Sequence, residues 1–362
     1  MARRTHNFNP GPAALPALVL EQAQCDLLDY DRTGLSILET SHRSAEYERV
    51  HESASEGLKR LLGLGDAHTV LFMGGGARTQ FGAVPMNLRA EGQSADYLLT
   101  GRWSHMAHEE ALKRGSAREA WSLEDKRPNR VPDPSEYEIA PNAAYLHITC
   151  NNTVFGTQFP ELPETGDIPL VSDISSEIAS RRLDYTRFGL AYAGAQKNLG
   201  PAGLTIVVVR NDILERSPDD IPDMLNYRKL AEKRSLLNTP PVFAIYLVNL
   251  VVRHALAEGG LDTIERRNRA QARLVYDVID NSDGFYRPHA ERDSRSLMNV
   301  TFELPSVDLD ARFIEESQAA GLIGLKGHRS VGGIRASLYN WVSTDSVRAL
   351  AEFMDEFQRR HG

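Results

Sequence analysis

Short apolar runs alternate with longer amphipathic stretches over most of this 362-residue chain. The runs are short and mostly apolar, which is typical of strands buried on both faces of a sheet. Helix-compatible stretches such as Gln80–Leu88 and His105–Lys113 lie between them. The alternation predicts an α/β fold with a mainly parallel sheet covered by helices. The predicted strands are Thr69–Met73, Ala95–Thr100, Tyr145–Thr149, Leu170–Ile174 and Thr205–Arg210.

The C-terminal part of the chain has a different order of elements, which predicts a smaller α+β domain. A long charged helix around Leu261–Ile279 joins it to the first domain. We therefore expect a large domain over residues 16–265 and a small domain formed by residues 1–15 and 266–362. The predicted small-domain elements are strands at Met298–Glu303 and Gly333–Leu338 and helices at Leu309–Ala320 and Ser346–Arg360.

Composition and charge exclude several classes of protein. With 41% hydrophobic residues and a net charge of −8, the chain is neither disordered nor suited to nucleic acid. Residues 1–8 lack the apolar core of a secretion signal. The most apolar run, Val242–Val252, is shorter than the roughly 20 residues that a membrane span needs. We expect a soluble cytoplasmic protein that binds neither nucleic acid nor a membrane.

No metal site is predicted. Motifs of zinc proteases, serine hydrolases and P-loop proteins are absent from the sequence. His105, His108 and Glu109 resemble a metal-binding helix, but a zinc ion needs three or four ligands. This polar stretch favours a solvated helix face instead.

Two of the loops beside predicted strands suit a phosphorylated aromatic ring. Gly74–Gln80 follows a strand and opens a helix, so its backbone N–H groups can hold a phosphate; a strained tight turn is the alternative. The segment is not the dinucleotide-binding motif, because the third glycine would fall on Thr79. Asp173 ends another strand, where its carboxylate can meet a ring nitrogen or cap the following segment.

Lys197 is the candidate nucleophile. It lies among small residues in Ala193–Gly203, and burial lowers the pKa of a lysine toward the range in which the amine reacts. A surface lysine is the alternative. That alternative is weakened because seven of the 41 basic residues are lysines and the remaining 34 are arginines.

Arginine and histidine gather in two further segments. Gly327–Arg335 contains His328, Arg329 and Arg335 among glycines, and His42–Arg43 repeats the pairing near the N-terminus. Arginine binds carboxylate or phosphate through two parallel hydrogen bonds. The alternative is a set of exposed salt bridges, each worth about 0–1 kcal/mol. The Gly74–Gln80 loop, Asp173, Lys197 and Trp103, which can stack on a ring, together form the set that pyridoxal phosphate requires.

Several motifs in the right order resemble the phosphoserine aminotransferase family, which are fold-type-I pyridoxal-phosphate enzymes of serine biosynthesis. The resemblance covers nearly the whole chain and implies a mainly parallel seven-stranded sheet in the large domain. The motifs are Asn7–Ala13, Ser41–Ser44, Gly75–Phe81, Val84–Leu88, Ala193–Gly203, Asn238–Pro241, Gly327–Arg329 and Gly333–Asn340.

The resemblance also implies roles for individual residues. Lys197 would form the Schiff base with the cofactor and move the proton during transamination. Asp173 would pair with the ring nitrogen, Trp103 would stack on the ring, and Thr153 would bind the 3′-oxygen. The residues implied to hold the cofactor phosphate are Ala77, Arg78 and Gln196 of one subunit and Asn238 and Thr239 of its neighbour, so a homodimer is expected. Thr239 with Pro240 and Pro241 predicts an N-cap followed by a helix start.

The implied substrates are phosphoserine, glutamate and 2-oxoglutarate. Each amino donor is anionic at both ends, so one site needs two cationic poles. Arg335 would bind the α-carboxylate. The residues implied for the distal phosphate or γ-carboxylate are His42, Arg43, His328 and Arg329.

Three points stay open on the sequence alone. A serine–glyoxylate aminotransferase or a cysteine desulfurase is the nearest alternative enzyme, and a non-catalytic phosphate-binding module is the alternative of another class. Phosphohydroxythreonine is a further possible substrate within the family. This chain also has Asn9–Pro10 where some members have Ser or Ala, and a proline lacks a backbone donor for substrate.

Overall fold

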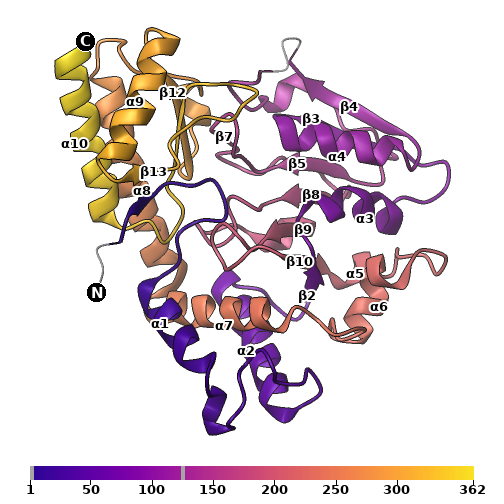
Figure 1. The fold of residues 1–362 in the computed structure, drawn as a ribbon. Coiled ribbons are helices and arrows are strands. Elements are labelled where there is room, and N and C mark those ends of the chain that lie inside the picture. The colour runs from indigo at the N-terminus through magenta and orange to yellow at the C-terminus, as the bar shows by residue number, and fades with distance from the viewer. Residues whose placement is uncertain (1–3, 124–126) are drawn as a thin grey trace.

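The computed structural model describes residues 4–123 and 127–362. Residues 1–3 of the predicted small-domain segment, and Lys126, lie outside the described residues. Figure 1 shows a large α/β body, with the orange and yellow elements of the C-terminal region forming a smaller body beside it.

The large body is built on a seven-stranded sheet in the order β2-β10-β9-β8-β5-β3-β4. Every neighbouring pair is parallel except those of β10, which runs antiparallel to both β2 and β9. The predicted α/β class with a mainly parallel sheet is therefore confirmed. The strands are β2 His68–Gly74, β3 Ala95–Leu99, β4 Ala117–Ser122, β5 Leu146–Thr149, β8 Leu170–Asp173, β9 Phe188–Gly194 and β10 Leu204–Arg210.

Two of these strands, β4 and β9, were not predicted. β4 lies at the sheet edge and is mostly exposed, so its sequence lacks an apolar run. β9 is entirely buried, yet alanine and glycine dilute its apolar pattern. Gly189 is required there, because an added Cβ would lie 2.8 Å from Pro169. Strand β9 ends at Gly194, so the turn that carries Lys197 follows this strand.

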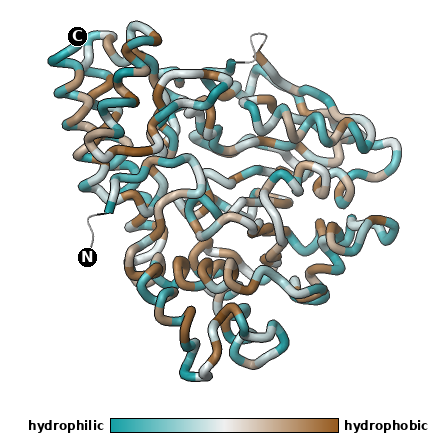
Figure 2. The backbone as a smooth tube through the Cα atoms, in the orientation of Figure 1, coloured by the Kyte–Doolittle hydropathy of each residue, from teal (hydrophilic) through white to brown (hydrophobic). Residues whose placement is uncertain are grey.

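Alternate residues of each strand face opposite layers of helices. Val70 and Phe72 of β2 pack with one helical layer, whereas Leu71 and Met73 pack with the other. The first layer contains α2 Ala45–Leu62 and α7 Val242–Ala257, and the second contains α3 Arg78–Leu88, α4 Arg102–Leu112 and α6 Tyr227–Glu232. Figure 2 shows hydrophobic colour concentrated along α7, which is buried between the sheet and α1 Ala17–Asp26. The short helix α5 Asn211–Leu214 follows β10.

The smaller body packs helices on a three-stranded antiparallel sheet. Four of its elements agree with the sequence predictions to within two residues: β12 Asn299–Glu303, β14 Ile334–Ser337, α9 Val307–Ala319 and α10 Thr344–His361. The short edge strand β11, Arg287–Pro288, was not predicted. Two short pairs complete the fold: β1 His6–Asn7 with β13 Leu322–Ile323, and β6 Asn151–Asn152 with β7 Thr157–Gln158.

Helix α8, Gly260–Asp280, links the two bodies. Leu261 and Ile264 belong to the core of the large body, and Ala272 and Val275 belong to that of the smaller one. The expected division at residues 265 and 266 falls between these two sets and stays a prediction. No single helix in the described ranges is long and apolar enough to cross a membrane; only α7 and α8 together meet that test, bent by 85°.

Candidate active site

A cavity of about 350 Å³ opens at the carboxyl edge of the central sheet, where ligands of α/β proteins bind. The end of strand β8, the turn after β9 and the first turns of α3 and α4 supply its walls. The cavity brings together six of the residues that the sequence assigned to the cofactor: Ala77, Arg78, Trp103, Asp173, Gln196 and Lys197.

Lys197 lies in the turn after β9 and is 9% exposed. Its Nζ donates a hydrogen bond to Oγ1 of Thr153 at 2.8 Å. Burial lowers the pKa of Lys197 to about 8; the Asp173 carboxylate opposes this shift and Arg335 adds to it. The amine is therefore partly neutral near neutral pH, as a nucleophile or a general base requires.

Thr153 is held by a chain of hydrogen bonds from the hairpin that carries it. Its Oγ1 donates to Oγ of Ser176 at 3.1 Å, and Ser176 donates to the backbone oxygen of Asn151 at 2.7 Å. Because the Thr153 proton is used in this chain, its oxygen lone pairs face the Lys197 amine. Thr153 does not itself line the cavity, but it positions the amine of Lys197, which does.

Asp173 ends strand β8 and is 6% exposed. One carboxylate oxygen accepts a hydrogen bond from the backbone N–H of Ser175 at 2.9 Å. Burial raises the pKa of Asp173, and the charge of Lys197 opposes that shift. A buried carboxylate beside an amine suits a cationic ring nitrogen, whose charge would keep the carboxylate ionised.

The glycine-rich segment after β2 is tied to the start of β10. Gly75 donates its N–H to the carbonyl oxygen of Gly203 at 2.9 Å, and its own carbonyl accepts from Thr205 at 3.1 Å. Gly75 has φ +103°, a conformation that favours glycine. Helix α3 then begins at Arg78 with no side-chain cap, which leaves its N-terminus open to an anion.

The cavity region contains buried polar atoms that a ligand can satisfy. Among the described residues, Nε1 of Trp103, Oε1 of Gln196 and Nε of Arg335 have no hydrogen-bond partner. A buried polar atom without a partner costs about 1–3 kcal/mol. These atoms fit a ligand that carries a phosphate, a polar ring and carboxylates.

Arg335, on β14, reaches the same region from the smaller body and is 6% exposed. Its Nη1 donates to the carbonyl oxygen of Thr153 at 3.4 Å. Within the described ranges, no carboxylate forms an ion pair with Arg335. Burial lowers the pKa of this guanidinium, which indicates that the charge is poorly compensated.

His328 and Arg329 lie on the loop before β14, with Arg329 exposed. The backbone N–H of Ser330 donates to Nδ1 of His328 at 3.2 Å, so the neutral ring carries its proton on Nε2 and can donate there. Burial lowers the pKa of His328 most. The charges of Arg102, Arg335 and Arg329 lower it further, in that order. Arg102, Arg329 and Arg335 therefore all lie close enough to His328 to influence its charge.

Two predicted pairs lie outside the cavity. His42 and Arg43 precede helix α2, and Arg43 is exposed. Asn238 and Thr239 precede helix α7 and line a separate hollow of about 450 Å³, which shares only Thr79 with the cavity. Within one protomer, neither pair joins the residues around Lys197.

The predicted N-cap at Thr239 is wrong. Helix α7 begins at Val242 with Pro241 at the N-cap position. A proline disfavours helical geometry in the residue before it, so Thr239 and Pro240 are both kept extended. Pro240 therefore does not take up the first helical position that an N-cap at Thr239 would need, and the helix begins at Val242.

Comparisons with known proteins agree with this geometry. Residues 5–350 match the model of the class-V aminotransferases. The chain belongs to the class-V aminotransferase family. It is 52% identical to the phosphoserine aminotransferase of Geobacillus kaustophilus over 99% of each chain. The resemblance to phosphoserine aminotransferases that the motifs indicated is therefore confirmed.

Solved structures of this family superpose closely on the chain. The phosphoserine aminotransferase from Bacillus circulans subsp. alkalophilus has a TM-score of 0.97 and 50% identity over 99% of both chains. The pyridoxal-phosphate-bound phosphoserine aminotransferase from Trichomonas vaginalis has a TM-score of 0.93 and 34% identity, over 97% of this chain and all of that one.

The N-terminal segment of this aminotransferase contacts the Lys197 turn. The N–H of Ala13 donates to the carbonyl oxygen of Gln196 at 2.9 Å, and Gly11 lies against the side chains of Gln196 and Lys197. Pro10 contributes its carbonyl oxygen, which accepts from the hydroxyl of Tyr339 at 3.1 Å. Pro10 therefore contributes an acceptor to this contact, although it lacks a backbone donor.

Sequence reasoning missed Arg102, which acts on His328 more strongly than Arg335 or Arg329. It also misplaced His108, which is buried rather than solvated, with Nε2 bonded to the carbonyl oxygen of Ala117 at 3.2 Å. The packing of α4 against β3 and β4 causes this burial. In the described ranges, no group of three or more His, Cys, Asp or Glu residues could hold a metal ion.

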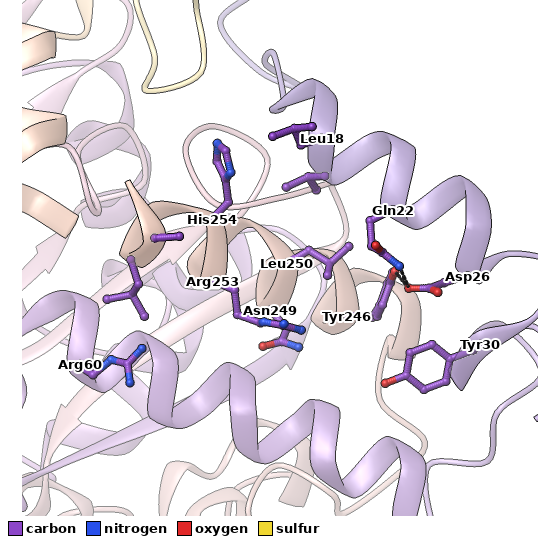
Figure 3. A pocket seen from close by; sticks show the side chains of 13 residues that line it. Leu18, Gln22, Asp26, Tyr30, Arg60, Tyr246, Asn249, Leu250, Arg253 and His254 are labelled. Atoms are coloured by element: carbon purple, nitrogen blue, oxygen red, sulfur yellow. Dashed lines mark hydrogen bonds between the residues drawn. The ribbon is translucent and has the colours of Figure 1, made fainter. Parts of the chain in front are cut away.

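A larger pocket of about 680 Å³ lies between α1, α2 and α7, away from Lys197 (Figure 3). Leucines and Tyr246 line it, and the Tyr246 hydroxyl donates to the Asp26 carboxylate. Neither cysteine lines the Lys197 cavity: Cys25 is exposed on α1 and Cys150 is buried in the core. This placement disfavours the cysteine desulfurase alternative, which needs a mobile catalytic thiol.

Proposed function

We propose that this class-V aminotransferase interconverts O-phosphoserine and 2-oxoglutarate with 3-phosphohydroxypyruvate and glutamate, using pyridoxal phosphate, in L-serine biosynthesis. Its proposed location is the cytoplasm. The observation that carries the proposal is the buried Lys197 amine, which shares a cavity with Asp173 and lies beside a buried arginine that has no described carboxylate partner.

Pyridoxal phosphate, when bound, supplies an aldehyde that reacts with amines and a ring that withdraws electrons. Asp173 would hold the ring nitrogen and Trp103 the ring face. Thr153 would bind the 3′-oxygen through the hydroxyl that now meets Lys197. The cofactor phosphate is assigned to the open start of helix α3, with Ala77, Arg78 and Gln196.

Lys197 would take a proton from the substrate Cα and return it. A pKa of about 8 makes the amine an acceptable base and its conjugate acid an acceptable donor near neutral pH. The hydrogen bond to Thr153 fixes the direction of the amine. The surrounding burial excludes water, which strengthens each charge interaction.

Two cationic poles would select the substrate. Arg335 would bind the α-carboxylate by paired hydrogen bonds, because it is buried and adjacent to Lys197. His328 and Arg329 would bind the distal phosphate of phosphoserine or the γ-carboxylate of glutamate. His42 and Arg43 are assigned to the same distal pole. Serine lacks a distal anion, so the proposal excludes it as a good donor.

The enzyme is proposed to act as a homodimer with shared active sites. Asn238, Thr239, His42 and Arg43 lie outside their own cavity, so they are available to a second copy. Helix α1 and the segment between α1 and α2 also expose apolar side chains that a second copy could cover. These are Leu18, Leu20, Leu27, Leu28, Leu35 and Leu38, which are 37–83% exposed.

The experiment is to purify the protein with pyridoxal phosphate and measure glutamate formed from phosphoserine and 2-oxoglutarate. The wild type should be yellow and active. Lys197→Ala should lose the absorbance band and at least about 10⁴-fold in rate, because it removes the nucleophile and the base. A colourless wild-type protein, or a yellow one that forms no glutamate, would refute the proposal.

A further inference from the structure

Arg102 is the first residue of helix α4 and precedes Trp103, which lines the cavity. The helix start is packed closely against the segment that carries Thr153. A Cβ added to Gly101 would lie 2.3 Å from Oδ1 of Asn152 and 3.3 Å from the ring of Phe155. Arg102 therefore has a fixed place beside the Thr153 segment.

The same segment joins Arg102 to the smaller body. The carbonyl oxygen of Phe155 accepts a hydrogen bond from Oγ1 of Thr301 at 2.9 Å. Thr301 pairs with Arg335 across strands β12 and β14. The start of α4, the Phe155 segment and strands β12 and β14 are consequently in continuous contact, with Arg102 at one end of this series and Arg335 at the other.

The cations along this series have no described counter-charge. Some arginines of the chain form ion pairs, for example Arg118 with Asp96 and Arg295 with Asp280, whereas others, such as Arg114, have none described. In residues 4–123 and 127–362, no ion pair involves Arg102, Arg329 or Arg335. Together they hold the pKa of His328 below its usual value, with Arg102 contributing most after burial. Such a grouping of like charges is stabilised by a bound anion.

We propose that Arg102 is a specificity-determining residue that binds the distal phosphate of phosphoserine. The proposal rests on the proposed phosphoserine transamination and adds a residue to its distal pole. A phosphate carries about one more negative charge than a carboxylate and has three acceptor oxygens, so a further cation beside Arg329 and the neutral His328 favours phosphoserine over glutamate. The half-exposed position of Arg102 leaves its guanidinium free to reach a ligand.

The test compares Arg102→Gln with Arg114→Gln in the cofactor-loaded enzyme. Arg114 is a matched control, because it follows the opposite end of the same helix, is exposed and has no described ion pair. Arg102→Gln should lower kcat/KM for phosphoserine about tenfold and that for glutamate less than threefold. Arg114→Gln should change both values less than twofold.

Binding of phosphoserine and of inorganic phosphate, measured by titration calorimetry, gives a readout separate from turnover. Both dissociation constants should rise in Arg102→Gln, while the cofactor absorbance stays unchanged. Arg102→Lys, which keeps the charge, should retain more phosphoserine binding than Arg102→Gln. Equal losses for phosphoserine and glutamate, or no loss for either, would overturn the proposal. A wild-type enzyme inactive with phosphoserine would instead refute the proposed function itself.

Discussion

The protonation of Lys197 depends on three influences that act in the same small volume. Burial favours the neutral amine, Asp173 favours the charged form, and Arg335 favours the neutral form again. Their balance leaves the pKa of Lys197 at about 8, below the ordinary value of 10.5. The residue can therefore both react with an aldehyde and exchange a proton at physiological pH.

A pH profile of cofactor uptake tests this balance. Only the neutral amine attaches the cofactor, so the uptake rate of the apoenzyme should rise with pH through a midpoint near 8. Asp173→Asn removes the charge that stabilises the ammonium and should move the midpoint down. Arg335→Met removes a repelling charge and should move it up. Stopped-flow absorbance measures the midpoint independently of the amplitude, and shifts in the opposite directions would contradict the assignment.

The two poles should respond differently to loss of their arginines. Arg335→Leu should lower kcat/KM for glutamate and phosphoserine alike, by about 10²-fold, because both donors carry an α-carboxylate. Arg329→Leu should affect phosphoserine more than glutamate, since phosphate carries the larger charge. Steady-state kinetics with each donor measures the ratios. Equal losses in both variants would show that the poles are wrongly assigned.

Helices and strands deliver these residues by ending at one edge of the sheet. Strand β8 ends at Asp173, β9 ends just before Lys197, and α4 begins beside Trp103. The start of α4 is set by Gly101, which lies against Asn152. Asn152 in turn donates hydrogen bonds to Thr100 and Thr157, both at 3.1 Å, and cannot easily move.

Gly101→Ala should therefore displace α4 and weaken cofactor binding. The added methyl group meets Asn152 at 2.3 Å, and such overpacking costs about 1–3 kcal/mol. Gly82→Ala is the matched control, because Gly82 lies within helix α3 and nothing approaches its added Cβ within 4 Å. The control should stabilise the protein by about 0.5–1 kcal/mol.

Cofactor titration and urea unfolding of the two alanine variants check this prediction. Gly101→Ala should show lower stability and a raised cofactor dissociation constant. If Gly101→Ala binds the cofactor as tightly as the wild type, the packing at the start of α4 does not position Trp103.

The sequence predicted five of the seven central strands, because short segments rich in large apolar residues are a strong local signal. β4 and β9 lacked that signal: one is an exposed edge strand and the other is rich in alanine and glycine. Their strand state depends on neighbours distant in sequence. The residues around Lys197 were predictable because each follows a strand in a recognisable motif.

Arg102 could not be predicted in this way. It stands in no glycine-rich or arginine-paired segment, and its importance arises from the packing of Gly101 on Asn152 and from the loop that carries His328. The clue in the sequence is Trp103 next to it, a residue already assigned to the ring. A neighbour of an assigned residue at a helix start is thus a candidate for the same site.

At the scale of the molecule, a net charge of −8 coexists with a local group of cations. The overall charge disfavours extended polyanions, whereas a small dianion responds to the field inside its cleft. The exposed leucines near α1 are a second large-scale feature, because they come shortly before His42 and Arg43 in the sequence. Both features fit an enzyme completed by a second copy.

Leu28→Asp should therefore dissociate the proposed dimer and reduce cofactor affinity, since Leu28 is 83% exposed on the candidate interface. Val307→Asp is the control, because Val307 is 81% exposed on helix α9 of the smaller body. Light scattering and cofactor titration measure the effect. A Leu28→Asp variant that stays dimeric, or a wild type that is monomeric, would contradict the placement of the interface.

The central claim is that this enzyme selects an amino donor with anions at both ends. The most direct test is one steady-state comparison of phosphoserine, serine and aspartate as donors to 2-oxoglutarate. We expect kcat/KM for phosphoserine to exceed that for serine by at least about 10³-fold, because serine leaves the distal cations without a counter-charge. Aspartate should also be a poor amino donor, since its side chain is too short for the carboxylate to reach the distal pole. Serine or aspartate turned over as well as phosphoserine would contradict the account.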